Sequence, residues 1–77
     1  MNILIVEDDE AIADFLGRGL AAQGHQPRTI PDGSDAVIAA GEDVVEMIIL
    51  DLTLPGMDGL EVLARVRARR PSLPVLV

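Results

Sequence analysis

Two short runs of the chain are apolar at every position, and the segments between such runs repeat hydrophobic residues at helical spacing. Residues 3–6 read Ile-Leu-Ile-Val and residues 47–50 read Met-Ile-Ile-Leu. Short runs without polar positions are typical of strands that are buried on both faces of a parallel sheet. Residues 26–30 predict a weaker strand at the sheet edge, because Pro27 cannot donate to a ladder. Residues 73–77 predict a fourth strand.

Helical periodicity connects these strands. A first helix is predicted from about residue 9 or 10 to residue 23, with Gly24 as its stop because glycine accepts the left-handed conformation. A short helix follows over residues 33–41, and a third over residues 59–69. The residues expected to face the core are Ile12, Phe15, Leu16 and Leu20, then Ala36, Val37 and Ala40, and finally Leu60, Leu63 and Val66.

The elements therefore alternate between strand and helix, beginning and ending with a strand and joined by short connections. Alternation of this kind predicts an α/β fold in which parallel strands are joined by right-handed crossovers. The 77 residues have room for one small domain, and they contain no linker, repeat or low-complexity segment.

Composition narrows the classes of function. There are 13 acidic residues against 6 arginines and no lysine, which gives a formal net charge of −7 and argues against nucleic-acid binding by this segment. The absence of cysteine excludes disulfides and thiolate metal sites. No apolar run approaches the roughly 18 residues that span a bilayer, and no basic signal-peptide region is present. We therefore expect a soluble, cytoplasmic domain without membrane contact.

Acids follow both fully apolar runs directly, with four at residues 7–10 and one at Asp51. In an open parallel sheet, ligands bind beyond the carboxyl ends of the strands. If the two strands are neighbours, Asp8, Asp9 and Asp51 converge there, and their mutual repulsion favours a hard divalent cation such as Mg²⁺. A cation beside Asp51 would neutralise charge on a phosphoryl group, and Asp51 would then serve as the nucleophile.

A plainer interpretation of the acids is open. Acids before a helix commonly cap its free N–H groups, and Glu7 and Glu10 are expected to be solvated. The joint arrangement favours a functional site: a double acid after one strand, a single acid after another, and then the turn residues Pro55-Gly56 and Asp58-Gly59.

The chain resembles the N-terminal part of a response-regulator receiver domain of two-component signalling. The matching motifs are residues 3–9, Asp32-Gly33 and residues 48–59. The resemblance implies a flavodoxin-like doubly wound sheet of order 2-1-3-4-5, of which this chain holds the part up to the fourth strand. Residues 1–77 would then form a truncated receiver domain.

The resemblance also implies roles for particular residues. Asp51 would accept a phosphoryl group from a sensor histidine kinase, and Mg²⁺ would be held by Asp8, Asp9, Asp51 and the backbone carbonyl of Thr53. Asp9 would bind the metal more directly, and Asp8 through water. Pro55, Gly56 and Gly59 would form the loop beside the site. Receiver domains are not conventional enzymes, but they catalyse their own phosphorylation and dephosphorylation.

The truncation has its own implications. The family's Thr or Ser after the fourth strand, and its lysine after the fifth, have no counterpart here, so switching should be impaired. The fourth strand becomes an exposed edge, and we expect the fragment to self-associate through such edges or through exchanged elements. In the full-length protein, a C-terminal winged-helix domain would bind DNA and regulate transcription.

The same residues allow three alternatives to this interpretation. The first is a protein-interaction fragment that is not phosphorylated, like a pseudo-receiver or an engineered half-domain. A phosphatase of the haloacid-dehalogenase type is disfavoured, because Thr53 stands where that family places a second acid. A dinucleotide-binding fold is disfavoured, because no Gly-x-Gly-x-x-Gly follows the first strand.

Overall fold

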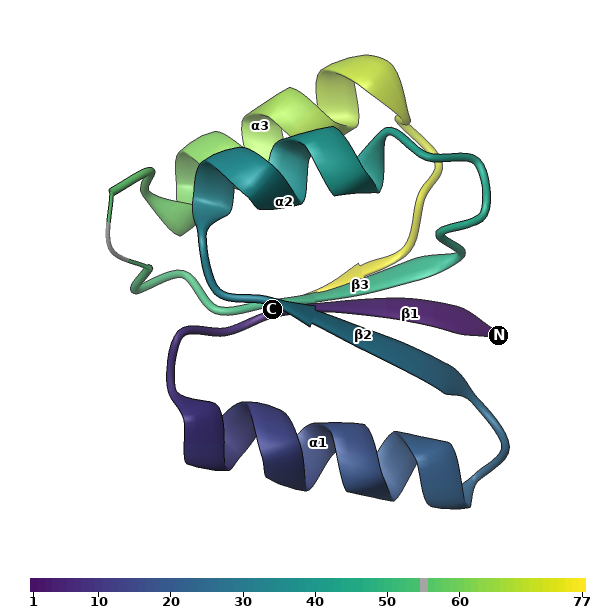
Figure 1. The fold of residues 1–77 in the computed structure, drawn as a ribbon. Helices are drawn as coiled ribbons and strands as arrows, with labels where there is room; N and C mark the ends of the chain where they lie inside the picture. The colour runs from purple at the N-terminus through teal and green to yellow at the C-terminus, as the bar shows by residue number, and fades with distance from the viewer. Residues whose placement is uncertain (55) are drawn as a thin grey trace.

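The computed structural model describes residues 1–54 and 56–77. Its strands and helices alternate as the sequence predicts (Figure 1), and the strands form one parallel sheet of order β2-β1-β3-β4. The elements in chain order are β1 (Asn2–Val6), α1 (Glu10–Ala22), β2 (Gln26–Ile30), α2 (Gly33–Ala40), β3 (Met47–Leu50), α3 (Gly59–Arg69) and β4 (Val75–Leu76).

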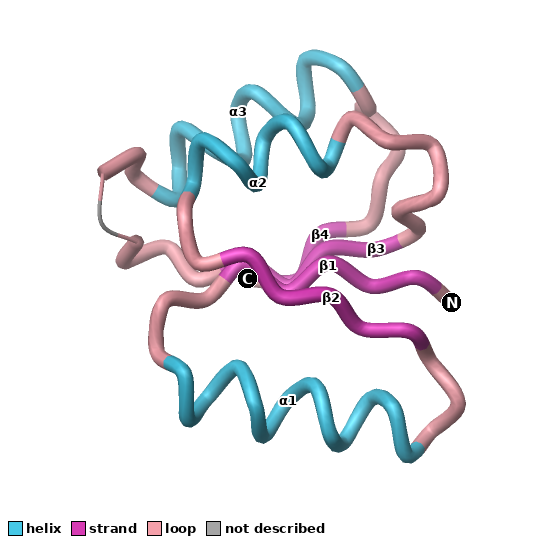
Figure 2. Tube along the Cα trace, viewed as in Figure 1, coloured by secondary structure: helices cyan, strands magenta, loops and turns pink. Residues whose placement is uncertain are grey.

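The sheet lies between two helical layers, with α1 on one face and both α2 and α3 on the other (Figures 1 and 2). The two fully apolar strands, β1 and β3, are central neighbours, and β2 lies at an edge as Pro27 predicted. The fourth strand is shorter than predicted and comprises only Val75–Leu76. None of the described helices is long and apolar enough to cross a membrane.

The main core lies between the sheet and the layer of α2 and α3. The strands contribute Leu4, Val6, Ile48 and Leu50, and the helices contribute Ala36, Ala39, Ala40, Val62 and Val66. Small alanines allow α2 to approach the sheet closely, and each fully buried Leu, Ile or Val contributes about 1.5–3 kcal/mol to folding. This core holds β1 and β3 in fixed register, and their carboxyl ends carry the acids.

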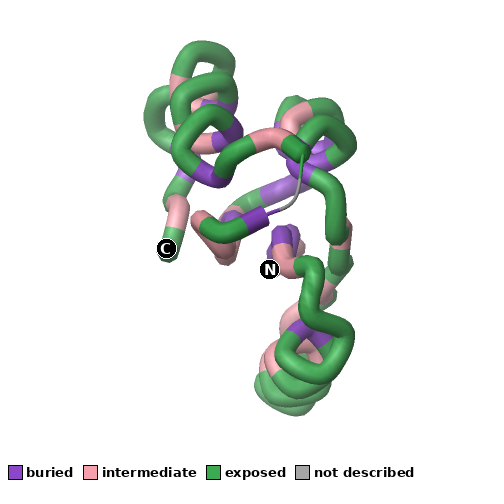
Figure 3. Tube along the Cα trace, turned by 90° about the vertical axis from the view of Figure 1, so that its left-hand side faces the viewer, coloured by how far each residue is buried: buried purple, intermediate pink, exposed green. Residues whose placement is uncertain are grey.

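The predicted apolar stripe of α1 is wrong at two positions. Ile12 is 48% exposed and Phe15 is 77% exposed, whereas Ala13 is buried and Leu16 and Leu20 are half-buried. α1 packs over β1 and β2, so its contact surface is centred on Ala13. Phe15 is two residues on, about 200° around the helix at 3.6 residues per turn, and so lies off the face that packs on the sheet. Figure 3 shows α1, at the bottom, coloured mainly as exposed.

The core face of α3 is also shifted from the prediction. Leu60 is 61% exposed, while Val62 and Val66 are buried and Leu63 is half-buried. The buried residues follow the 59, 62, 66 spacing that starts at Gly59, so Leu60 falls on the flank of the helix. In α2, Ala36 and Ala40 are buried as predicted, joined by Ala39, whereas Val37 is half-buried.

Arg70 ties the carboxyl ends of α2 and α3 together. Its guanidinium donates hydrogen bonds to the carbonyl of Ala40 at 3.1 Å and to that of Glu42 at 2.9 Å. These carbonyls lie at or just beyond the last turn of α2, where backbone acceptors lack helical partners. These two bonds therefore provide donors for carbonyl groups at the end of α2, and they fix the position of α2 beside α3.

Candidate functional site

The carboxyl ends of β1 and β3 bring acids from distant parts of the chain together. Val6 pairs with Leu50, and the ladder continues for one more bond, in which the N–H of Asp51 donates to the carbonyl of Val6 at 2.9 Å. Beyond this point one carboxylate oxygen each from Glu7, Asp8 and Asp51 lies within 4.8 Å of the others. Glu7 and Asp51 are half-buried, and Asp8 is exposed. Parallel pairing of two central strands thus brings Asp8 and Asp51 together, with Glu7 in the position where the sequence predicted Asp9.

Asp9 does not belong to this cluster among the described residues. It is the N-cap of α1, where its Oδ1 accepts hydrogen bonds from the N–H groups of Ala11 at 2.9 Å and Ile12 at 3.1 Å. Its own N–H donates to Oε1 of Glu7 at 3.0 Å. The capping role left open for these acids therefore describes Asp9 in the structure.

Glu7 is the site residue that the sequence reasoning missed, because it was expected to be solvated. Its N–H donates to the carbonyl of Ile30 at 3.3 Å, so hydrogen bonding to β2 continues past Val6 and holds Glu7 at the sheet end. A signal was available in the sequence. An Asp directly before Glu-Ala-Ile-Ala is a preferred N-cap, which leaves the two preceding acids, Glu7 and Asp8, for the strand end.

Thr53 makes two hydrogen bonds to the carboxylate of Asp51. The backbone N–H donates to Oδ1 at 2.9 Å, and the hydroxyl Oγ1 donates to the same oxygen at 2.8 Å. These two bonds stabilise the charged form and hold the pKa of Asp51 below its usual value of 3.8. Asp51 is therefore an ionised carboxylate at neutral pH, which is the state that a nucleophile requires.

The pKa of Glu7 shifts in the opposite direction. Partial loss of hydration raises it above 4.5, and the nearby charges of Asp51 and Asp8 add to this effect, while the N–H of Asp9 opposes it. The raised pKa of Glu7 shows that the negative charges of the three carboxylates repel one another. Oxygen donors and excess negative charge are the conditions that suit a hard divalent cation.

The loop after Asp51 is held against the start of α3 by Gly59. Its N–H donates to the carbonyl of Leu52 at 3.3 Å, and an added Cβ would lie 2.8 Å from the carbonyl oxygen of Asp51 and would also strike the backbone of Leu52. Only glycine permits this approach. Gly56 has φ of +75°, a conformation that glycine adopts readily. Pro55, predicted to belong to the same loop, lies outside the described residues.

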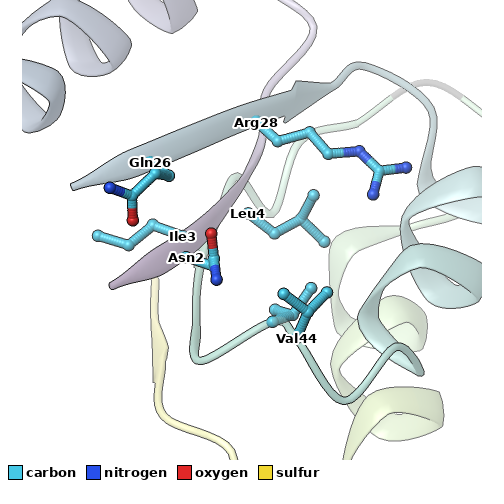
Figure 4. Close-up of a pocket in the computed structure, with 7 residues that line it drawn as sticks. Asn2, Ile3, Leu4, Gln26, Arg28 and Val44 are labelled. Carbon is cyan, nitrogen blue, oxygen red and sulfur yellow. The ribbon is translucent and has the colours of Figure 1, made fainter.

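A separate small cavity of about 70 Å³ opens at the other end of the sheet (Figure 4). It lies beside the first residues of β1 and β2, and its lining is mainly apolar apart from Asn2, Gln26 and Arg28. Arg28 forms an ion pair with Glu42 at 3.3 Å. Because this cavity is far along the strands from the acids, it takes no part in the cluster.

Comparison with known proteins agrees with this arrangement. The family model described as the response regulator receiver domain matches residues 3–77. The chain belongs to this family. The resemblance seen in the motifs is therefore confirmed, as is the α/β fold with its four parallel strands and three helices.

A curated relative is the transcriptional regulatory protein TcrA of Mycobacterium tuberculosis (strain ATCC 25618 / H37Rv). It is 42% identical over 77 residues, which are 100% of this chain and 30% of that protein. This receiver chain thus spans less than a third of the length of that relative.

Solved receiver structures superpose closely on the backbone of this chain. The receiver domain of sensor histidine kinase PA1611 from Pseudomonas aeruginosa PAO1, with magnesium in its active-site cleft, superposes with a TM-score of 0.90 at 28% identity, covering 96% of this chain and 62% of that one. A Burkholderia pseudomallei response regulator with a phosphorylated aspartic acid and a calcium ion gives 0.85 at 31% identity, covering 96% and 44%. A complex of histidine kinase ThkA with response regulator TrrA gives 0.88 at 28% identity, covering 96% and 64%.

Proposed function

We propose that the chain is the phosphoacceptor part of a response regulator, and that Asp51 accepts a phosphoryl group from a sensor histidine kinase. An oxygen of Asp51 forms the new P–O bond while the P–N bond to the kinase histidine breaks, and the imidazole leaves with the bonding electron pair. The observation that carries this proposal is an ionised Asp51 whose carboxylate lies within 4.8 Å of those of Glu7 and Asp8 at the carboxyl end of the sheet.

Mg²⁺ fits the donor set of this site, because three carboxylates within 4.8 Å provide only oxygen ligands. We propose that Asp8, Asp51 and the backbone carbonyl of Thr53 hold the ion, and that Glu7 assists them. When bound, the ion would neutralise charge on the phosphoryl group. Asp9 was predicted as a ligand from the sequence, but its use as the α1 cap favours Glu7 for the remaining acidic position.

Partners follow from the same proposal. The structurally similar complex of histidine kinase ThkA with response regulator TrrA supports a sensor kinase as the phosphodonor. Because the chain spans 30% of the regulator TcrA, we propose that transcriptional output, and any DNA binding, belong to a region outside these residues. The net charge of −7 agrees with no nucleic-acid contact by the receiver segment itself. We propose the cytoplasm as its location.

Beryllofluoride, which mimics an aspartyl-bound phosphoryl group, tests the proposal directly. The chain contains no Trp or Tyr, so the measurement should use ¹⁹F and amide NMR instead of intrinsic fluorescence. We expect a bound ¹⁹F signal with Mg²⁺ and none after Asp51→Asn, a variant that can still accept the hydrogen bonds of Thr53. Binding that persists in Asp51→Asn, or no binding by the wild-type chain, would contradict the proposal.

Exposed apolar surface favours a second role, self-association of the 77-residue chain. Ile48 and Val75 pack toward α2 and α3, so the alternate residues Ile49 and Leu76 face the side of α1. α1 packs mainly against β1 and β2 there, and Leu76 is 55% exposed. We propose that a second copy covers this half of the sheet together with Phe15, because β3 and β4 contain no charged residue to oppose the contact.

A further inference from the structure

The helices α2 and α3 begin with the same pair of residues. Asp32 and Asp58 are their N-caps, and each is followed by a buried glycine, Gly33 or Gly59. The two helices lie side by side, and both begin at the end of the sheet where the loop from β3 to α3 lies (Figure 1). Gly59 lies against the backbone of Asp51, whereas Gly33 reaches the loop from a different part of the chain.

Gly33 has no room for a side chain, because both the loop and α3 lie against it. An added Cβ would lie 3.0 Å from the Cβ and from the carbonyl oxygen of Met57, and 2.9 Å from Cγ2 of Val62. Val62 is 1% exposed in the close-packed core, so it has little freedom to move. Met57 is half-buried and belongs to the loop, so a larger residue at position 33 would displace mainly Met57.

A continuous line of contacts leads from Met57 to Asp51. Met57 is two residues before Gly59, and a Cβ on Gly59 would lie 2.8 Å from the carbonyl oxygen of Asp51. The N–H of Gly59 also donates to the carbonyl of Leu52 at 3.3 Å. Because coupling between distant groups is carried by packed neighbours, a displacement of Met57 would reach the backbone of Asp51 through Gly59.

We infer that Gly33 is a positioning residue for the cluster of Glu7, Asp8 and Asp51, and that it keeps the backbone of Asp51 in the geometry that binds Mg²⁺. Gly33 does this by letting Met57 pack directly against the first turn of α2. This inference rests on the proposed function, because it concerns Mg²⁺ binding at that site. Replacing a residue that orients a metal ligand commonly weakens metal binding by about 10–100-fold. Gly33 acts through two intermediate contacts, so a smaller effect is expected.

The experiment compares the Mg²⁺ affinities of variants of the full 77-residue chain by amide NMR titration with MgCl₂. We expect Gly33→Ala to weaken Mg²⁺ binding about fivefold, which is below the usual range for a residue that touches a metal ligand. Gly41→Ala is the matched control, because it makes the same change at the other end of α2. A Cβ at position 41 would meet Ile38 and Arg69 but not the loop, so the affinity should match the wild type.

Val62→Ala separates positioning from general stability. Alone, it removes buried methyl groups and should lower the free energy of unfolding in urea, yet it does not push the loop and should leave the Mg²⁺ affinity unchanged. In the double variant Gly33→Ala/Val62→Ala, the new methyl group gains space on the side of α3, so most of the lost affinity should return. If Val62→Ala alone weakens Mg²⁺ binding as much as Gly33→Ala, or if the double variant does not recover, the inference is overturned.

A second measurement uses only the wild-type chain and so does not depend on whether a variant folds. Because coupling between two sites is reciprocal, Mg²⁺ binding should shift the amide resonances of Gly33 and Met57 and leave that of Gly41 in place. Wild-type affinity in Gly33→Ala, or an unshifted Gly33 resonance in the Mg²⁺-bound chain, would overturn this inference alone. A wild-type chain that does not bind Mg²⁺ would overturn the proposed function and the inference with it.

Discussion

Replacing Glu7 and Asp9 separately should show which acid assists Asp8 and Asp51 in binding Mg²⁺. The sequence motif favours Asp9, whereas the structure places Glu7 in the cluster and uses Asp9 as a helix cap. Glu7→Gln removes the charge with little change in shape. Asp9→Asn also removes a charge, but it leaves the cap intact because Asn is as good an N-cap as Asp.

The expected magnitude follows from the geometry. A doubly charged cation about 5 Å from the Glu7 carboxylate is attracted by about 1.7 kcal/mol even at the dielectric constant of water. The site is largely solvated, so we take this low estimate, which predicts that Glu7→Gln weakens Mg²⁺ binding by about 20-fold. Asp9→Asn removes an exposed, screened charge and should change the affinity by less than about twofold.

Amide NMR titration with MgCl₂ measures both affinities, and Asp9→Ala provides a further comparison. That variant loses the cap and should lower the free energy of unfolding by about 1 kcal/mol, again with little effect on Mg²⁺. Stronger weakening by Asp9→Asn than by Glu7→Gln would refute the structural assignment and restore Asp9 as the metal ligand.

Three further predictions concern other parts of the chain. Gly59→Ala should lower the free energy of unfolding in urea by about 3 kcal/mol, because the added methyl group meets the backbone after Asp51. Gly19→Ala, with open space around it, should raise that free energy by up to about 1 kcal/mol. Equal effects of the two substitutions would contradict this reasoning. Because the pKa of Asp51 is lowered, its ionised form stabilises the folded chain above the usual pKa of 3.8, and this contribution is lost as pH falls through the lowered value. Without Mg²⁺, wild-type stability followed by circular dichroism should therefore fall more steeply with acid than that of Asp51→Asn, and parallel curves would count against the Thr53 bonds. In sedimentation velocity, Phe15→Glu should shift the chain toward monomer, while a charge at Ile38, 71% exposed on the opposite layer, should not; a wild-type chain that is already a compact monomer would end the self-association proposal.

The local pattern of apolar and polar residues was sufficient to predict most of the fold. Uniformly apolar runs at residues 3–6 and 47–50 indicated central parallel strands, and Pro27 indicated an edge, because both features depend on the chemistry of a single strand. The position of Asp51 directly after a buried strand likewise placed it at the carboxyl end of the sheet. These conclusions needed no knowledge of how far one element lies from another.

Only the tertiary structure decided which acids meet and which helix faces are covered. Glu7 joins Asp51 because hydrogen bonding to β2 extends past Val6, whereas Asp9 turns its carboxylate to the first N–H groups of α1. Phe15 belongs to an apolar helix pattern, yet it is exposed because it lies off the face of α1 that packs on β1 and β2. Periodicity defines the faces of an element, but burial and ligand geometry depend on the neighbours that the fold brings to each face.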